Sequence, residues 1–274
     1  MSFDLSPARV TRTLFAGVVL LHAASFGGQY SKYFLGHDYL LGFVPKTFVG
    51  TDFNVPTWFS SVLLLACAAA LAVAALTRPA RARDFRFWIA LAVLFTYMSM
   101  DEAAGLHELA IRPLRAALAA RFGASSVEGY LHLPWVIPFG LFALAVFAAA
   151  LPFLTRLPGR TSARFIFAGG VYLSGAMGVE TLGAPYVAAL GLEDWTVTMI
   201  LTAEEALEML GALLFFHAIL CHLAGQRDSI RITLSAGGPS NASEVAPRIA
   251  YQGPAALPRG AAAAVVHTAH IAAV

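Results

Sequence analysis

Residues Thr57–Leu76 read TWFSSVLLLACAAALAVAAL, an apolar stretch without a charged side chain. About 20 residues of this kind form a helix long enough to cross the hydrocarbon core of a bilayer. The whole 274-residue chain has a similar character, since 58% of it is hydrophobic and only 12% is charged, against roughly 25% in soluble domains. These proportions exclude a soluble enzyme and a disordered protein. A net charge of +2 is also too small for a nucleic-acid binder.

Five more segments of suitable length and hydrophobicity flank this one. They are Thr11–Gly28, Phe87–Ile111, Leu133–Thr155, Phe165–Pro185 and Trp195–Leu223. We therefore predict an all-α, polytopic membrane helix bundle with six transmembrane helices in residues 1–223. Residues 224–274 are rich in Ala, Gly, Pro and Ser, which predicts a mostly disordered cytoplasmic tail. The first span also fits the apolar region of a signal peptide, and we favour a retained helix.

The basic residues indicate how the helices are oriented. Lys and Arg concentrate before the first span, between the second and third, between the fourth and fifth, and in the tail. The alternate loops carry fewer, and the loop after the fifth span has only acidic charges, at Glu193 and Asp194. Because cytoplasmic loops are enriched in Lys and Arg, both termini are predicted to be cytoplasmic.

Seven of the 16 acidic residues lie inside predicted spans. The third span has Asp101, Glu102 and Glu108, the fifth has Glu180, and the sixth has Glu204, Glu205 and Glu208. No Lys or Arg lies deep in any span. A carboxylate near the bilayer centre costs about 2.5–3.5 kcal/mol. These acids therefore require bound cations, protonation or a water-filled cavity.

Helix geometry predicts that these acids share one layer. At about 1.5 Å per residue, all seven fall between the bilayer centre and its outer interface. His107 lies beside Glu108, and His22 of the first span falls at a comparable depth. We therefore expect a single polar site that opens to the outside.

Carboxylates with one or two imidazoles and no nearby thiolate suit iron, manganese or zinc. The acids outnumber the ligands that one divalent ion needs, so we expect a dinuclear site, with iron favoured. The expected metal ligands are Glu102, His107, Glu108, Glu180, Glu204, Glu208 and His22. Asp101 and Glu205 are the expected catalytic groups, which carry protons or orient a ligand. The chain has no Glu-x-x-His motif, unlike the di-iron carboxylate bundles.

Some of these residues also have simpler interpretations. Glu108 and Arg112 are four residues apart and suit an ion pair at the interface. His22 suits a hydrogen-bonded packing residue. Asp101 or Glu102 suits a protonated acid bonded between helices.

The pattern favours an integral-membrane metal enzyme, such as an oxygen-dependent oxidoreductase with a lipid-soluble substrate. The alternative is a divalent-cation or proton-coupled transporter, since acids on several helices suit an ion pathway. Against a transporter, the third and sixth spans show no obvious Gly or Pro break at their acids. Haem-based electron transfer through His22 with His107 or His132 leaves the acids unexplained.

The first outer loop, residues 29–56, is long and rich in aromatic residues. It suits an aromatic belt at the membrane interface. It also suits a lid over the acids, with Asp52 and Asn54 approaching them, because long loops inside compact domains are often functional.

Three motifs carry a resemblance to a known group. They are Asn54-x-Pro-Thr-Trp-Phe-Ser60, Asp101-Glu102-x4-His107-Glu108 and Glu204-Glu205-x2-Glu208. Together they resemble an uncharacterised family of bacterial six-span integral-membrane proteins, over all six spans and without the tail. The resemblance implies a bacterial inner-membrane location and no particular activity.

With the predicted orientation, the site would face the periplasm. The expected partners are the lipid bilayer and a lipid-soluble small molecule or metal ion, and no nucleic acid. The sequence does not define an oligomeric state.

Overall fold

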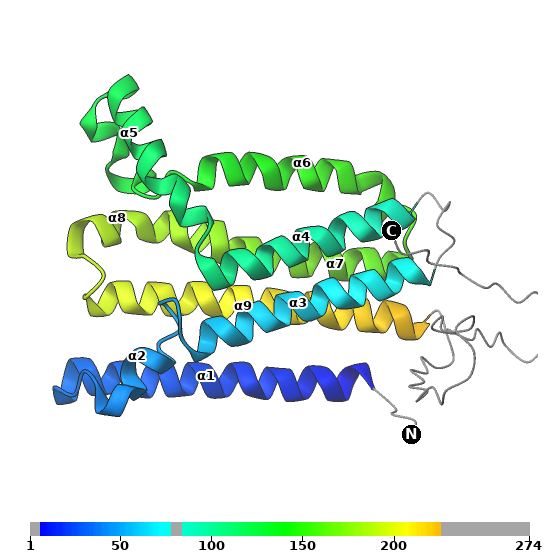
Figure 1. Ribbon diagram of the computed structural model, residues 1–274, viewed down its shortest axis with the longest axis horizontal. Helices are drawn as coiled ribbons and strands as arrows, with labels where there is room; N and C mark the ends of the chain where they lie inside the picture. Colours follow the sequence, from blue (N-terminus) through cyan, green and yellow to red (C-terminus); the bar gives the residue numbers. More distant parts are fainter. Residues whose placement is uncertain (1–5, 78–83, 226–274) are drawn as a thin grey trace, which may run out of the picture.

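The computed structural model describes residues 6–77 and 84–225, and within these ranges the chain is all-α (Figure 1). Six of its helical segments are long and apolar enough to cross a membrane, which confirms the predicted six-span bundle. Apart from its first two residues, the predicted tail lies outside the described residues. The side of the membrane on which the termini lie stays a prediction.

The first, second, third and fourth spans are the helices α1 (Pro7–Leu35), α3 (Val55–Leu76), α4 (Phe85–Ala104) and α6 (Val136–Leu154). The fifth consists of α7 (Gly159–Leu173) and α8 (Glu180–Leu190), joined by a π-helical turn, η5 (Ser174–Val179). The sixth is α9 (Trp195–Gly225). The connections hold α2 (Phe43–Thr47), α5 (Ile111–Phe122) and the short turns η1 (Leu40–Gly42), η2 (His107–Ala110), η3 (Ala124–Val127) and η4 (Gly129–Leu131).

The bundle is built around α9, which packs against α1, α3, α7 and α8 (Figure 1). Near the start of α9, the hydroxyl groups of Tyr33 and Thr198 lie 2.9 Å apart. Near its end, His217 Nδ1 lies 2.8 Å from the hydroxyl of Thr11. The first and last spans are therefore antiparallel, and the start of α1 and the end of α9 lie at the same end of the bundle.

The apolar core lies between α3, α4, α7 and α9. Small residues of α3, such as Cys67 and Ala75, are fully buried and allow the neighbouring helices to approach closely. Trp88 of α4 is also fully buried, and its ring meets those of Phe153 and Phe165 edge-on, at centroid distances of 5.1 and 6.0 Å. These rings join α4, α6 and α7 near one end of the core.

The third span ends earlier than the sequence predicts. The predicted helix Phe87–Ile111 stops at Ala104, because Gly105 adopts a left-handed conformation with φ of +58° and donates its N–H to Asp101 O at 2.7 Å. The prediction that this span has no break at its acids is wrong for the same reason. His107 and Glu108 lie in the turn η2, beyond the membrane-spanning helix.

The first loop is shorter than predicted, since α1 continues through Gln29 and ends at Leu35. The loop is fixed to the helices beside it. Asn54 caps α3 by accepting the Thr57 N–H at 3.0 Å, and its amide donates to Phe48 O at 2.6 Å. The N–H of Val49 donates to the hydroxyl of Ser25 on α1 at 3.1 Å.

Candidate functional site

A cavity of about 1110 Å³ lies between α6 and the helices α4, α7, α8 and α9. It exists because α6 packs closely only near its C-terminal end. Within α6 only Ala150, Phe153 and Leu154 are buried, and Phe153 stacks on Phe87 with ring centroids 4.4 Å apart. The middle of α6 leaves room between itself and the bundle. The volume is slightly above the usual range for small-molecule sites, and the wall is mostly apolar and aromatic.

Eight of the nine predicted site residues line this cavity: Asp101, Glu102, His107, Glu108, Glu180, Glu204, Glu205 and Glu208. No Lys or Arg is among the described residues that line it. The structure thus brings acids from three spans to one wall, where no basic side chain offsets their charge.

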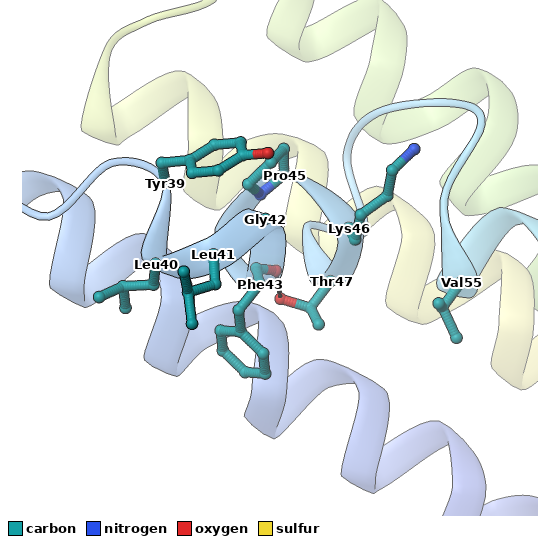
Figure 2. A pocket seen from close by; sticks show the side chains of 9 residues that line it. All are labelled: Tyr39, Leu40, Leu41, Gly42, Phe43, Pro45, Lys46, Thr47 and Val55. Carbon is teal, nitrogen blue, oxygen red and sulfur yellow. Dashed lines mark hydrogen bonds between the residues drawn. The ribbon is translucent and has the colours of Figure 1, made fainter.

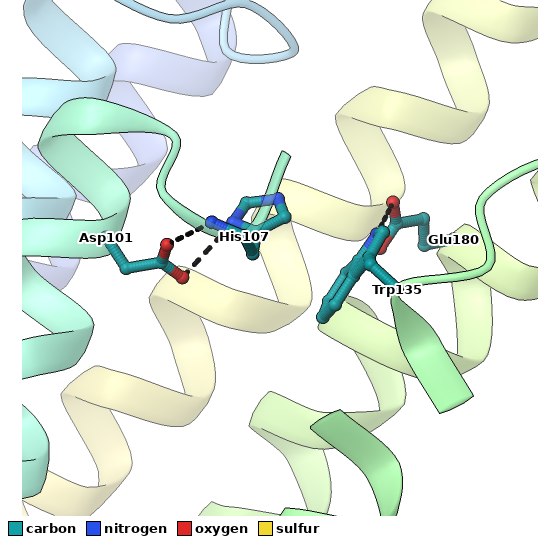
Figure 3. A network of polar contacts seen from close by, with 4 residues as sticks. All are labelled: Asp101, His107, Trp135 and Glu180. Atoms are coloured by element: carbon teal, nitrogen blue, oxygen red, sulfur yellow. Dashed lines mark hydrogen bonds and ion pairs between the residues drawn. The ribbon is translucent and has the colours of Figure 1, made fainter. Parts of the chain in front are cut away.

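Asp101 holds His107 in place at the end of α4 (Figure 3). The reversal at Gly105 turns His107 back toward the last turn of the helix. One carboxylate oxygen of Asp101 accepts the backbone N–H of His107 at 2.7 Å, and the other lies 3.1 Å from its Nδ1. Because Nδ1 faces Asp101, Nε2 is the ring nitrogen left for a ligand.

The charges around His107 outweigh its burial. Burial alone would lower the pKa of this imidazole. The hydrogen bond and charge of Asp101, together with the charges of Glu180 and Glu108, raise the pKa above its usual value instead. The acidic wall therefore favours a cation at this point.

Trp135, which precedes α6, connects His107 with Glu180. Its Nε1 donates a hydrogen bond to Glu180 Oε1 at 2.8 Å, and its ring centroid lies 4.6 Å from that of His107 (Figure 3). The sequence did not single out Trp135, because a Trp near a span end is also typical of an aromatic belt. Glu180 directly follows the π-helical turn η5, a feature that often occurs at functional sites.

Two glycines let α9 approach the fifth span. A Cβ on Gly175 would lie 2.7 Å from the carbonyl oxygen of Glu204, and a Cβ on Gly211 would lie 2.5 Å from the backbone nitrogen of Tyr172. Across this contact the side chains of Tyr172 and Glu208 lie within electrostatic range of each other. The sequence did not predict a role for Tyr172 either, because only the register between the two helices determines which residue it faces.

The second span and its loop complete the wall. The hydroxyl of Ser60 on α3 lies near the carboxylate of Glu102. Asp52 of the loop lines the cavity, whereas Asn54 serves as the cap of α3. Burial and the nearby charge of Asp101 raise the pKa of Asp52, and the charge of His107 partly opposes them.

The lining residues that could bind ions can be sorted into two adjoining groups. In the histidine group, which we define as His107, Glu180 and Glu204, each side chain interacts with the charges of the other two. In the carboxylate group, defined as Glu102, Glu205 and Glu208, the three side chains interact in the same way. Glu102 also interacts with His107, and Glu204 interacts with Glu205 and Glu208. The two groups therefore adjoin as one connected cluster of charges.

Two predicted ligands stand apart from these groups. His22 does not line the cavity; its Nδ1 lies 2.9 Å from Val18 O in its own helix. Its Nε2 is buried without a hydrogen-bond partner. Glu108 lines the cavity and bends toward Gly105, and it is absent from the ion pairs found among the described residues, including any with Arg112.

The donor atoms are close without converging. Within residues 6–77 and 84–225, no group of three or more His, Cys, Asp or Glu side chains is arranged to hold a metal ion. One buried oxygen, Glu204 Oε2, nevertheless has no hydrogen-bond partner. The donor types therefore fit a hard or borderline ion, and the positions of the side chains do not yet form its coordination sphere.

A second hollow, of about 600 Å³, lies on the loop between α1 and α3 (Figure 2). It is lined mainly by apolar residues around Tyr39 and Phe43, and Lys46, whose Nζ donates to Phe53 O at 2.9 Å, is the charged residue beside them. It has no acid among its described lining residues. The predicted site residues therefore belong to the larger cavity.

Comparisons with known proteins give a family and no activity. Residues 12–223 match the family described as "Domain of unknown function (DUF8692)", and the chain belongs to that family. The match covers the six spans and excludes the tail, in agreement with the extent of the resemblance seen in the motifs. No curated protein and no solved structure matches the chain.

Proposed function

We propose that the chain is a metal-dependent membrane enzyme that acts on a lipid-soluble substrate held in the cavity beside α6. The observation that carries this proposal is the combination of one wall of carboxylates and imidazole, without a basic residue among the described lining, and an apolar remainder. Such a wall offsets a bound cation, and the apolar surface accepts a hydrophobic molecule from the bilayer.

The histidine group and the pair Glu102 and Glu208 of the carboxylate group are the proposed binding sites for two ions, with Glu205 beside the second ion. Dinuclear sites use carboxylates from several helices of one bundle. His107 has a feature typical of metal-binding histidines, because a carboxylate, Asp101, engages its other ring nitrogen. When bound, a divalent ion would act as a Lewis acid or activate water, and iron would also bind oxygen.

The residues of the chain have separate roles in this proposal. Asp101 fixes the ring of His107. Glu205 receives or returns a proton beside the substrate, with Asp52 within its electrostatic range. Because three donors do not yet converge in the described residues, ion binding must draw the side chains of each group together.

The proposal predicts that metal content depends on both groups. The chain is purified in nanodiscs with its lipids, and its iron, manganese and zinc contents are measured with Glu180→Gln and Glu208→Gln variants. We expect about two ions per wild-type chain and a loss of about one ion in each variant. Glu193→Gln is the matched control, because Glu193 is exposed and pairs with Lys32 outside the cavity. Equal metal content in all four proteins would contradict the proposal.

A divalent-cation or proton-coupled transporter is the second candidate, because two spans are broken at their acids. Gly105 ends α4 three residues after Glu102, and the π-helical turn directly precedes Glu180. Transporters bind ions at such interrupted helices. Metal-dependent flux in liposomes, together with no tightly bound metal, would favour this candidate over the enzyme.

We also propose that the cavity faces the periplasm of a bacterial inner membrane. The acids of α9 lie in its first half, whereas the start of α1 lies beside the end of α9. The distribution of basic residues assigns the start of α1 to the cytoplasm. A Glu128→Cys variant tests the side: a membrane-impermeant maleimide should label it in intact spheroplasts. Labelling only after lysis would reverse the orientation.

A further inference from the structure

A second polar cluster lies at the other end of the bundle, away from the cavity acids. His217 of α9 lies between two partners: its Nδ1 is 2.8 Å from the hydroxyl of Thr11 on α1, and its Nε2 is 3.3 Å from Sγ of Cys221. In an activated nucleophile, a thiol lies beside an imidazole that acts as base, and a third polar group orients the imidazole. Cys221, His217 and Thr11 have this arrangement.

The hydrogen bonds of Thr11 define the tautomer of His217. The Thr11 hydroxyl donates its single proton to Pro7 O at 2.8 Å. It must therefore accept a hydrogen bond from His217 Nδ1, which then carries the ring proton. Nε2 consequently presents its lone pair to Cys221 and is placed to take the proton of the thiol. A packing histidine needs no such orientation.

The thiol lies at a depth that both lipid and water can reach. At 31 residues, α9 is longer than the roughly 20 residues that span the hydrocarbon core. Cys221 lies one turn before the end of the helix and is only half-buried. The other cysteine, Cys67, is fully buried in the apolar core, where its Sγ faces Ala212 O at 3.5 Å.

The surroundings of the cluster are basic. Arg164 of α7 is exposed and lies within electrostatic range of His217. Arg12 of α1 is the neighbour of Thr11 in sequence and is also exposed. Positive charge near the cluster attracts an anionic reactant.

We propose that Cys221 is a base-activated acylation site, which accepts a fatty acyl group from a long-chain acyl thioester with an anionic carrier. His217 Nε2 takes the proton of Sγ, and the sulfur attacks the thioester carbonyl carbon. The bond between that carbon and the carrier sulfur breaks, and the carrier thiolate takes the proton back from His217. The products are acylated Cys221 and the free carrier thiol, and the acyl chain remains in the bilayer.

The test uses the full chain in nanodiscs, incubated with an alkyne-tagged palmitoyl-coenzyme A. Label that hydroxylamine removes is then measured over time. We expect labelling of the wild type and of Cys67→Ser, and none of Cys221→Ser. His217→Ala should slow labelling about 100-fold, in the range of general base catalysis. Thr11→Val should slow it less, and Thr11→Ser should restore it because the hydroxyl returns.

Three results would overturn the proposal. The first is labelling of Cys221→Ser at the wild-type rate. The second is an unchanged rate in His217→Ala, which would mean that the imidazole only packs beside the thiol. The third is an equal slowing by Thr11→Ser and Thr11→Val. Each variant is accepted only if its thermal unfolding matches the wild type, and His217→Gln, which keeps a polar side chain, replaces His217→Ala if that variant fails to fold.

Discussion

The two halves of α9 have opposite surroundings. From Met209 to Leu223 the helix is packed against α3 and α7, and Leu213 and Ile219 are at most 1% exposed. From Trp195 to Glu208 the same helix presents three carboxylates to the cavity. A buried acid without a cation costs stability, so it persists only where function compensates for it. The packed half therefore holds the bundle together, and the acidic half carries the proposed metal site.

The largest expected effect is in the packed half, at Gly211. A Cβ there would lie 2.5 Å from the backbone nitrogen of Tyr172, which cannot move as a side chain can. We expect Gly211→Ala to lower the free energy of unfolding by about 3 kcal/mol. Gly170→Ala is the matched control, because no atom lies within 4 Å of its added Cβ. Equal melting temperatures for both variants in detergent would contradict the close contact.

A smaller loss of stability is expected from a cavity made in α3, which packs against this half of α9. Leu71 is fully buried, so Leu71→Ala removes packing contacts without touching the acidic wall. We expect a destabilisation of about 2 kcal/mol, measured by thermal unfolding, and unchanged metal content. A loss of bound metal in Leu71→Ala would show that the two halves are not separable.

In the acidic half, replacing an acid by a neutral side chain should not lower the stability of the protein. Glu208→Gln replaces a half-buried acid of the cavity wall by a neutral amide of similar size. The metal-free variant should therefore be at least as stable as the metal-free wild type. Thermal unfolding of both proteins is compared after metal has been removed with a chelator. A clearly less stable variant would contradict the presence of an uncompensated charge at Glu208.

A change of about 1 kcal/mol in the free energy of unfolding is expected at Trp135, where the chain entering α6 meets the acidic wall. Trp135→Phe keeps a ring beside His107 and removes the hydrogen bond to Glu180. Its free energy of unfolding should fall by that amount. Trp58→Phe is the control, since Trp58 is 65% exposed. Similar values for the two variants would mean that the indole N–H contributes nothing.

The smallest effect concerns the titration of His107. Its folded pKa is raised, so protonation stabilises the fold below the unfolded pKa of about 6.5, and this contribution is lost as pH rises through the folded pKa. Asp101→Asn removes the main cause of the increase, and the remaining burial lowers the pKa. NMR titration of the imidazole in the metal-free protein should therefore show a lower pKa in Asp101→Asn. An unchanged pKa would exclude the observed Asp101–His107 pair.

The spans, and the position of their acids at a similar depth, were predictable from the sequence because the chain has few charged residues. Acids without basic partners, such as Glu180 and Glu204, are conspicuous in apolar helices, and helical rise alone fixes their depth. The break at Gly105 was missed, because one glycine in an apolar run is compatible with a continuous helix. The sequence also favoured His22 as a ligand on depth alone, although the direction of a side chain depends on packing.

The partners of the acids were not predictable for a related reason. These partners are Ser60, Trp135 and Tyr172, which lie in or next to three different helices. The relative rotation of the helices follows from close contacts, such as those at Gly175 and Gly211. Short apolar sequences do not encode this rotation locally. The two groups of donors could therefore be recognised only from the assembled bundle.

The metal content of the wild-type chain, isolated in nanodiscs without chelators, tests the central claim most directly. Inductively coupled plasma mass spectrometry should find about two iron ions per chain. The triple variant Glu102→Gln, Glu205→Gln and Glu208→Gln should retain about one, bound by the histidine group. Equal amounts of metal in the two proteins, or none in the wild type, would contradict the assignment of the acidic wall as a metal site.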